Sequence, residues 1–170
     1  MIFDNSSMEN LDASKFYKLL LSDLGFTAKA GQDLALQQLS RFVLSNNKDE
    51  LFVLKGFAGT GKTTIISTLV KNLWQIRKSG VLLAPTGRAA KVISNYSKKE
   101  AFTIHKKIYF PKKSGGSGVQ FVLQPNKHKN SIFIVDEASM ISDTPTNSKL
   151  MENGSLLDDL IQFVYSGHNC

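Results

Sequence analysis

The stretch LFVLKGFAGTGKTTIISTLVKNLW, residues 51–74, decides the fold. It opens with a short, largely apolar run at residues 51–55 that is followed by Gly56, which is typical of a buried strand. From Thr63 to Arg77 the apolar residues recur at helical spacing. A glycine-rich loop joins the two parts, so the stretch predicts a strand, a loop and a helix in direct succession.

The loop carries the pattern G-x-x-x-x-G-K-S/T, which Gly56, Gly61, Lys62 and Thr63 satisfy. Its glycines let backbone N–H groups point into one concavity, and the start of the next helix adds positive potential, so the loop can hold phosphate oxygens. Lys62 adds a charge for the outer phosphates, and the Thr63 hydroxyl is a hard oxygen ligand for Mg²⁺. We therefore expect ATP and Mg²⁺ as cofactors; an incidental glycine-rich turn would not explain the strand and helix beside it. The predicted nucleotide-binding residues of the loop are Gly56, Phe57, Ala58, Gly59, Thr60, Gly61, Lys62, Thr63 and Thr64.

Two neighbouring carboxylates, Asp136 and Glu137, follow a second apolar run at residues 132–135. Ligands of open α/β sheets bind beyond the carboxyl ends of the strands, so we expect Asp136 near the same ligand as Lys62. We assign Asp136 to the Mg²⁺ shell and Glu137 to the activation of water. Lys62 and Glu137 are then the catalytic residues, and ATP hydrolysis is favoured over kinase chemistry. The alternative is an acidic turn that only closes a strand.

The remaining pattern alternates strands with helices, which predicts βαβ units, a mostly parallel sheet and an α/β fold. Residues 108–110 and 119–123 break this alternation, because they flank a glycine- and serine-rich stretch and predict a β-hairpin. Further helices are predicted at residues 10–24, 30–44, 87–97 and 156–165, and further strands at 81–84 and 132–135.

The net charge of +7 is unevenly distributed along the chain. Between Arg77 and Lys129 there are twelve Lys or Arg and one acid, Glu100, so this region alone carries +11. Such a region fits contact with a polyanion and a solvated basic face about equally well. The one cysteine, Cys170, excludes a disulfide within the chain, and no secretory signal or membrane-length apolar run is present. We expect a cytoplasmic protein without a membrane partner.

Four segments in order resemble the leading motifs of superfamily 1 DNA helicases, with the RecD-like and Dda-like branch the most similar. They are GFAGTGKTT at residues 56–64, LAPTGRAAK at 83–91, FTIH at 102–105 and VDEASM at 135–140. The resemblance covers roughly residues 27–142. It implies a P-loop NTPase domain of RecA-like, three-layer fold that couples ATP hydrolysis to movement along single-stranded DNA. Clamp loaders and packaging motors are also P-loop ATPases, but assigning the chain to either class would not explain the second and third segments.

The resemblance also implies roles for individual residues. Gln32 falls where these helicases carry a glutamine that reads adenine. A glutamine amide suits this role because it can donate and accept hydrogen bonds at once. Gln37 and Gln38 lie close enough to Gln32 in the sequence to be alternatives. For His105 a structural hydrogen-bonding role fits as well as DNA contact, and the hairpin either contacts DNA or only covers the sheet. The implied DNA-contacting residues are Pro85, Thr86, Gly87, Arg88, Lys91, Thr103, His105 and Lys106.

The chain also departs from the family pattern. A second RecA-like domain, which supplies an arginine to the transition state, and a strand between those carrying Lys62 and Asp136 have no counterpart in the 170 residues. We expect residues 1–26 to form a helical extension and 27–170 an incomplete first RecA-like domain of a larger, monomeric helicase. Such a domain should bind ATP but hydrolyse it poorly alone. The alternative is a remnant that binds nucleotide or nucleic acid without hydrolysis.

Overall fold

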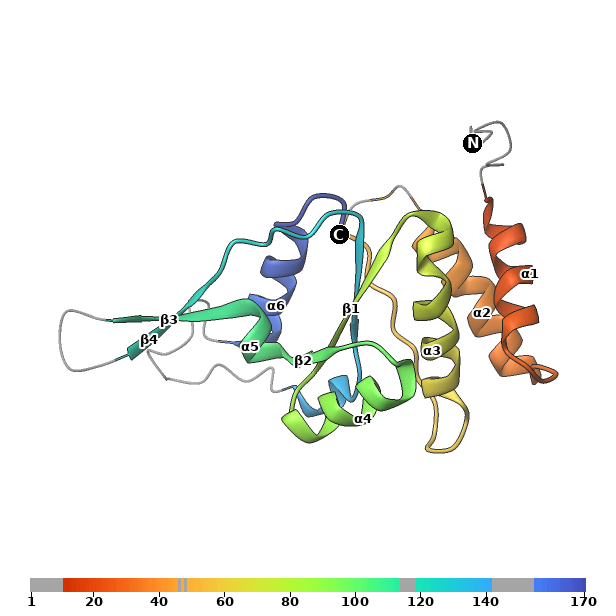
Figure 1. The fold of residues 1–170 in the computed structure, drawn as a ribbon, viewed down its shortest axis with the longest axis horizontal. Helices are drawn as coiled ribbons and strands as arrows, with labels where there is room; N and C mark the ends of the chain where they lie inside the picture. Colours follow the sequence, from red (N-terminus) through yellow and green to blue (C-terminus); the bar gives the residue numbers. More distant parts are fainter. Residues whose placement is uncertain (1–10, 46, 48, 114–118, 142–154) are drawn as a thin grey trace, which may run out of the picture. The chain divides into compact units, whose positions relative to one another are not determined.

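The structure, a computed structural model, describes residues 11–45, 47, 49–113, 119–141 and 155–170 (Figure 1). The first ten residues of the predicted extension and the tip of the predicted hairpin lie outside these ranges. The chain divides into two compact units, Met1–Ile76 and Arg77–Cys170, which are taken in turn. None of the described helices combines the length and apolar character that a membrane crossing requires.

The N-terminal unit is built from helices. They are α1 (Ala13–Asp23), α2 (Ala30–Val43) and α3 (Lys62–Asn72), and α3 continues as the 3₁₀ helix η1 (Leu73–Ile76). Helix α1 begins after Asp12, whose side chain caps it by accepting a hydrogen bond from the Lys15 N–H at 2.8 Å. The single tryptophan of the chain lies in η1. The core of this unit consists of Phe16, Leu20, Leu24, Ala35, Leu36, Leu39, Val43, Ile65, Leu69, Val70 and Leu73.

The strand predicted at residues 51–55 is absent, and this prediction is wrong. The segment belongs to no sheet of the described chain, although its side chains alternate in exposure with the period of a strand. Leu51 is 72% exposed and Val53 61%, whereas Phe52 is half-buried with its ring 5.5 Å from that of Phe42. A strand needs a neighbour that pairs with its backbone groups, and an apolar pattern alone does not supply one.

The C-terminal unit contains a parallel sheet of β1 (Ser79–Ala84), β2 (Ala101–Thr103) and β5 (Ser131–Val135), in the order β2-β1-β5. The central strand β1 is apolar on both faces, as a strand covered from both sides must be. The α/β fold with a parallel sheet is therefore confirmed. The strand β1 starts two residues before its predicted position, and β2 was not predicted.

Helices cover both faces of this sheet. Helix α4 (Gly87–Ser97), at its predicted bounds, leads from β1 to β2 and packs with Ala89 and Ala90 against Ala84. The neighbouring residue Leu83 faces the opposite side, in a cluster with α5 (Ile104–Ile108) and α6. The full cluster is Val81, Leu83, Ile104, Ile108, Tyr109, Leu156, Leu160 and Phe163.

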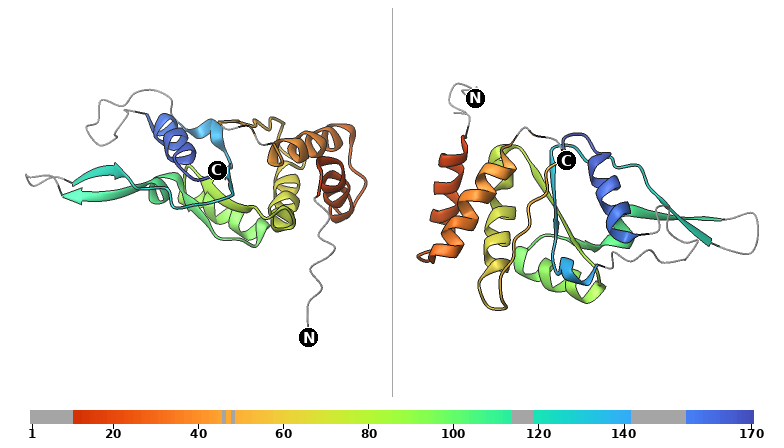
Figure 2. Two further views of the ribbon diagram at one scale, coloured as in Figure 1. Left: turned by 90° about the horizontal axis from the view of Figure 1, so that it is seen from above. Right: turned by 180° about the vertical axis from the view of Figure 1, so that it is seen from behind.

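The predicted hairpin and last helix are both present. Strands β3 (Tyr109–Lys113) and β4 (Val119–Leu123) pair antiparallel, and the hairpin extends away from the sheet (Figure 2). Helix α6 (Leu156–Tyr165) starts at Ser155, whose side chain accepts from the Asp158 N–H. The hairpin is fastened to α6 at its base, because the Tyr109 hydroxyl donates to the buried Asp159 carboxyl group at 2.5 Å.

Replacing Tyr109 with phenylalanine is expected to lower the free energy of unfolding by about 1–3 kcal/mol, because a buried carboxyl group loses a hydrogen bond that water cannot replace. Urea unfolding followed by circular dichroism measures the change. Tyr96→Phe is the matched control, because the Tyr96 side chain is 67% exposed. Equal midpoints for the two variants would show that the Tyr109–Asp159 contact contributes nothing to stability.

Candidate functional site

The glycine-rich loop of the N-terminal unit folds as its glycines require. The Thr60 N–H closes a turn on the Phe57 carbonyl, and Gly59 and Gly61 have φ of 76° and 88°, in the left-handed region that favours glycine. Gly61 is the N-cap residue of α3. Gly56 is required for a different reason: a Cβ at this position would lie 2.9 Å from the Thr60 hydroxyl, which leaves no room for a side chain.

The Phe57 carbonyl is the centre of the loop's hydrogen bonds. It accepts from the Thr60 hydroxyl at 2.8 Å and from the Lys62 ammonium at 2.9 Å, and the same ammonium donates to the Gly56 carbonyl at 2.6 Å. Lys62 is the first residue of α3, where backbone N–H groups have no partner within the helix and the helix dipole is positive. This group of donors can hold an anion, with Thr63 half-buried in the same turn.

Gln32 lies against this loop. Its amide Nε2 donates to the Thr60 carbonyl at 3.1 Å, and its Oε1 accepts from the Lys29 N–H at 3.0 Å in the first turn of α2. The competing residue Gln37 instead donates to Asp33, and Gln38 is exposed. Of the three glutamines, Gln32 is the one for which a contact with the loop is found among the described residues.

In the C-terminal unit, the predicted residues follow three parallel strands. Parallel strands end at one edge of the sheet. At this edge β1 leads into Pro85, β2 ends at Thr103, and β5 leads into Asp136. The sheet therefore brings the carboxylates and the predicted DNA-contacting segments to one edge of this unit.

The backbone at Asp136 and Glu137 continues the sheet and then turns sharply. The Asp136 N–H donates to the Leu83 carbonyl at 3.0 Å, which continues the pairing of β5 with β1, and the Asp136 Oδ1 accepts from the Glu137 N–H at 3.0 Å. Glu137 has φ of 53°, which is uncommon for a residue with a side chain, and precedes the 3₁₀ helix η2 (Ala138–Met140). Asp136 is half-buried and Glu137 is exposed, so the Glu137 carboxylate is accessible to water.

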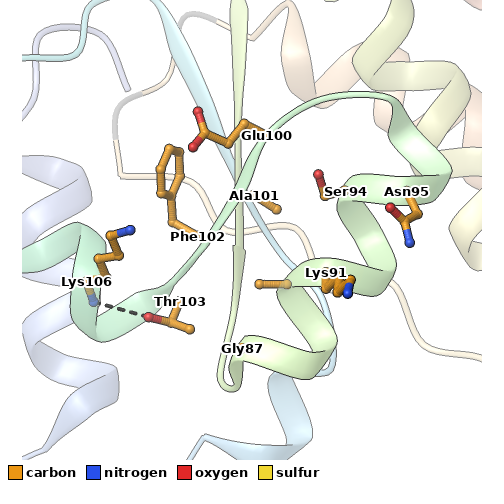
Figure 3. Close-up of a pocket in the computed structure, with 10 residues that line it drawn as sticks. Gly87, Lys91, Ser94, Asn95, Glu100, Ala101, Phe102, Thr103 and Lys106 are labelled. Atoms are coloured by element: carbon orange, nitrogen blue, oxygen red, sulfur yellow. Dashed lines mark hydrogen bonds between the residues drawn. The ribbon is translucent and has the colours of Figure 1, made fainter.

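A pocket of about 290 Å³ lies between α4, β2 and α5 (Figure 3). It brings together four of the predicted DNA-contacting residues; Pro85, Thr86, Arg88 and His105 do not line it. Figure 3 shows residues of α4 on one side of β2, with Phe102 and Lys106 on the other. The lining residues are Gly87, Ala90, Lys91, Ser94, Asn95, Glu100, Ala101, Phe102, Thr103 and Lys106.

Two predicted DNA-contacting threonines have capping roles. The Thr86 hydroxyl accepts from the Ala89 N–H at 3.2 Å at the start of α4, and the Thr103 hydroxyl accepts from the Lys106 N–H at 3.3 Å at the start of α5. His105 is exposed, and its ring centroid lies 5.8 Å from that of Tyr109. The threonines therefore hold the first turns of the helices that carry Lys91 and Lys106.

Sequence reasoning missed Ser94, Asn95 and Phe102 as pocket residues. Ser94 follows Gly87 by seven residues and Lys91 by three, so helical spacing could have identified it. The Lys107 ammonium lies over the Phe102 ring, 4.8 Å from its centroid, in a cation–π contact. Burial lowers the pKa of Lys107, and the charge of Glu100 acts in the opposite direction.

The chain is similar in sequence to several known proteins. A sequence model described as AAA domain matches residues 40–164. ATP-dependent DNA helicase dda of Enterobacteria phage T4 is 37% identical over 90 residues, which cover 51% of this chain and 20% of that protein. An uncharacterized protein of Methanocaldococcus jannaschii is 34% identical over 146 residues, covering 78% of this chain and 12% of that protein. An uncharacterized protein of Acanthamoeba polyphaga mimivirus is 31% identical over 133 residues, covering 65% of this chain and 27% of that protein.

These relatives are much longer than the chain, which matches between 12% and 27% of their lengths. No solved structure matches the chain.

Proposed function

The chain belongs to the AAA domain family, and we propose that it is the ATP-binding motor part of a DNA helicase of superfamily 1, in the RecD-like and Dda-like branch. It couples ATP hydrolysis to movement along single-stranded DNA. The observation that carries the proposal is the glycine-rich loop, which leads directly into α3 with Gly61 in a left-handed conformation and Lys62 as the first helical residue. The 37% identity to a phage DNA helicase supports the choice of reaction.

The loop fits a triphosphate with Mg²⁺. Its positions 56 and 61 have no room for a side chain, and the unpaired N–H groups of α3 and the Lys62 ammonium supply donors for phosphate oxygens. In this proposal the Thr63 hydroxyl and the Asp136 carboxylate would each offer Mg²⁺ the hard oxygen ligand that it prefers. When bound there, Mg²⁺ would neutralise part of the phosphate charge. Glu137 orients the attacking water and accepts its proton.

The pocket beside α4 is the proposed contact with single-stranded DNA. Lys91 and Lys106 line it from two helices, and it lies within the region of net charge +11. Phosphate groups are held by such lysines and by hydroxyl groups, while flat or small groups meet the bases. In this proposal residues 27–170 act as a first RecA-like domain, residues 1–26 extend it, and a second such domain of a cytoplasmic, monomeric full-length protein completes the motor.

The test of the function is a calorimetric titration of the purified chain with Mg·ATP, followed by ATP turnover of the full-length protein with and without single-stranded DNA. Saturable binding and stimulated turnover are expected. Absence of saturable binding would overturn the proposal. Binding without turnover would favour the second candidate, a module that binds nucleotide or nucleic acid without hydrolysis.

Lys91→Ala and Lys106→Ala are each expected to weaken binding of a single-stranded oligonucleotide roughly threefold to tenfold and to reduce the slope of log affinity against log salt by about 0.7, because one phosphate contact is lost. Fluorescence anisotropy over a series of KCl concentrations measures both quantities. Lys18→Ala, an exposed lysine of α1, is the control. An unchanged salt slope in both pocket variants would mean that DNA does not bind there.

A further inference from the structure

Gln32 uses both ends of its amide within the N-terminal unit. The Oε1 atom accepts from the Lys29 N–H, which fixes the side chain on the first turn of α2, and the Nε2 atom donates to the Thr60 carbonyl of the glycine-rich loop. The two bonds, at 3.0 and 3.1 Å, have ordinary hydrogen-bond lengths. A side chain held at both ends can fix the position of the group it contacts.

The group that it contacts is the peptide between Thr60 and Gly61. The carbonyl and the N–H of a trans peptide point in opposite directions. Because Gln32 reaches the loop from a separate helix and its amide donates to the Thr60 carbonyl, the Gly61 N–H on the other side of the same peptide points away from the Gln32 amide. This N–H is one of the donors expected to hold phosphate.

A steric contact restrains the same peptide. A Cβ at Gly61 would lie 2.5 Å from the Gln32 Nε2, so the amide lies directly over the Gly61 backbone with no space between them. Two features favour glycine at position 61: its φ of 88° is costly for other residues, and a side chain there would displace the Gln32 amide from the loop.

From this geometry we infer that Gln32 is a positioning residue of the phosphate loop, which orients the Thr60–Gly61 peptide for the triphosphate whether or not a base is present. The inference rests on the proposed function. It is compatible with adenine recognition, because an amide has two N–H donors and two lone pairs on its oxygen, and one of each remains unused. The same side chain then links base recognition to the shape of the loop.

The decisive ligand is inorganic Mg·tripolyphosphate, because it has phosphates but no base. Gln32→Met keeps the length of the side chain and removes both polar ends, and Gln38→Met is the matched control on an exposed position of the same helix. Calorimetry is expected to show tripolyphosphate binding that is roughly threefold to tenfold weaker in Gln32→Met, the effect of about one net hydrogen bond, and unchanged in Gln38→Met. Gln32→Asn, one methylene shorter, is expected to show the same loss, because it cannot span both partners.

A spectroscopic readout separates positioning of the loop from simple stabilisation of α2. The Gly61 amide resonance in a nitrogen–proton correlation spectrum reports on the hydrogen bond at the preceding carbonyl, and it is expected to shift in Gln32→Met and Gln32→Asn but not in Gln38→Met. Unchanged tripolyphosphate affinity and an unmoved Gly61 resonance, with a reduced preference for ATP over GTP, would overturn the inference and leave the proposed function intact. Failure of the unsubstituted chain to bind either ATP or tripolyphosphate would overturn both.

Discussion

Lys62→Ala is expected to weaken Mg·ATP binding to the chain by about two orders of magnitude and to lower ATP turnover of the full-length protein by at least as much. The ammonium of Lys62 is the one side-chain positive charge within the loop of residues 56–63. Removal of a single preorganised donor at an oxyanion site commonly lowers kcat on the order of 10²–10³-fold, and a hydrogen bond to a charged group is worth about 1.5–3 kcal/mol. The substitution also removes the bonds to the Gly56 and Phe57 carbonyls, so the loop loses a restraint as well as a charge.

Calorimetry with Mg·ATP measures the loss of binding, and circular dichroism checks that the variant is folded. Lys55→Ala is the matched control, because Lys55 is exposed and directly precedes the loop. If Lys62→Ala binds Mg·ATP as tightly as Lys55→Ala does, the triphosphate is not held by this loop, and the motor function falls with it.

Glu137→Gln is expected to lower single-stranded-DNA-stimulated turnover by about 10²–10⁴-fold, the usual contribution of a general base, while Mg·ATP affinity changes less than about twofold. The amide keeps the size of the carboxylate but cannot accept a proton from water. Glu137 contributes to its own turn through backbone groups: its N–H donates to the Asp136 carboxylate and its carbonyl accepts from the Met140 N–H. The substitution leaves both bonds in place.

Turnover and affinity are measured on the same preparations of the full-length protein, so a loss of folding would lower both together. Glu50→Gln is the control, because this exposed glutamate of the N-terminal unit lies outside every predicted site. Turnover that survives in Glu137→Gln would assign water activation to another group.

The elements that could be predicted are those specified locally. Helix α4 has its predicted bounds, because Thr86 caps its start and Lys98 ends it in a left-handed conformation. Helix α6 likewise follows Ser155 with a continuous apolar face. In both cases the signals that set the bounds lie within a few residues of the helix ends, so the sequence alone contains them.

The elements that could not be predicted depend on partners distant in the chain or are too short for a periodic pattern. Residues 51–55 have the composition of a buried strand, but no described strand pairs with them. Strand β2 has three residues and α5 has five, fewer than a pattern of either period needs to be recognised. Strand β2 forms because it pairs with β1, which is a contact between residues distant in the chain.

For the candidate site, the motifs identified the segments but not their arrangement. The position of Asp136 at the carboxyl edge of the sheet followed from the order of strand and carboxylate. The contact of Gln32 with Thr60 joins residues 28 positions apart and could not be read from spacing. The capping bonds of Thr86 and Thr103 were missed because a threonine before a helix fits both a cap and a phosphate contact.

The left-handed backbone conformation of Glu137 raises the question of why a glutamate, and not a glycine, occupies this turn. A residue with a side chain pays about 1–3 kcal/mol in such a conformation, and glycine or asparagine would adopt it at less expense. Evolution toward thermal robustness alone would favour replacing the glutamate. In the proposed mechanism this cost is offset by a carboxylate that activates water, a trade-off between stability and activity of the kind known from other proteins.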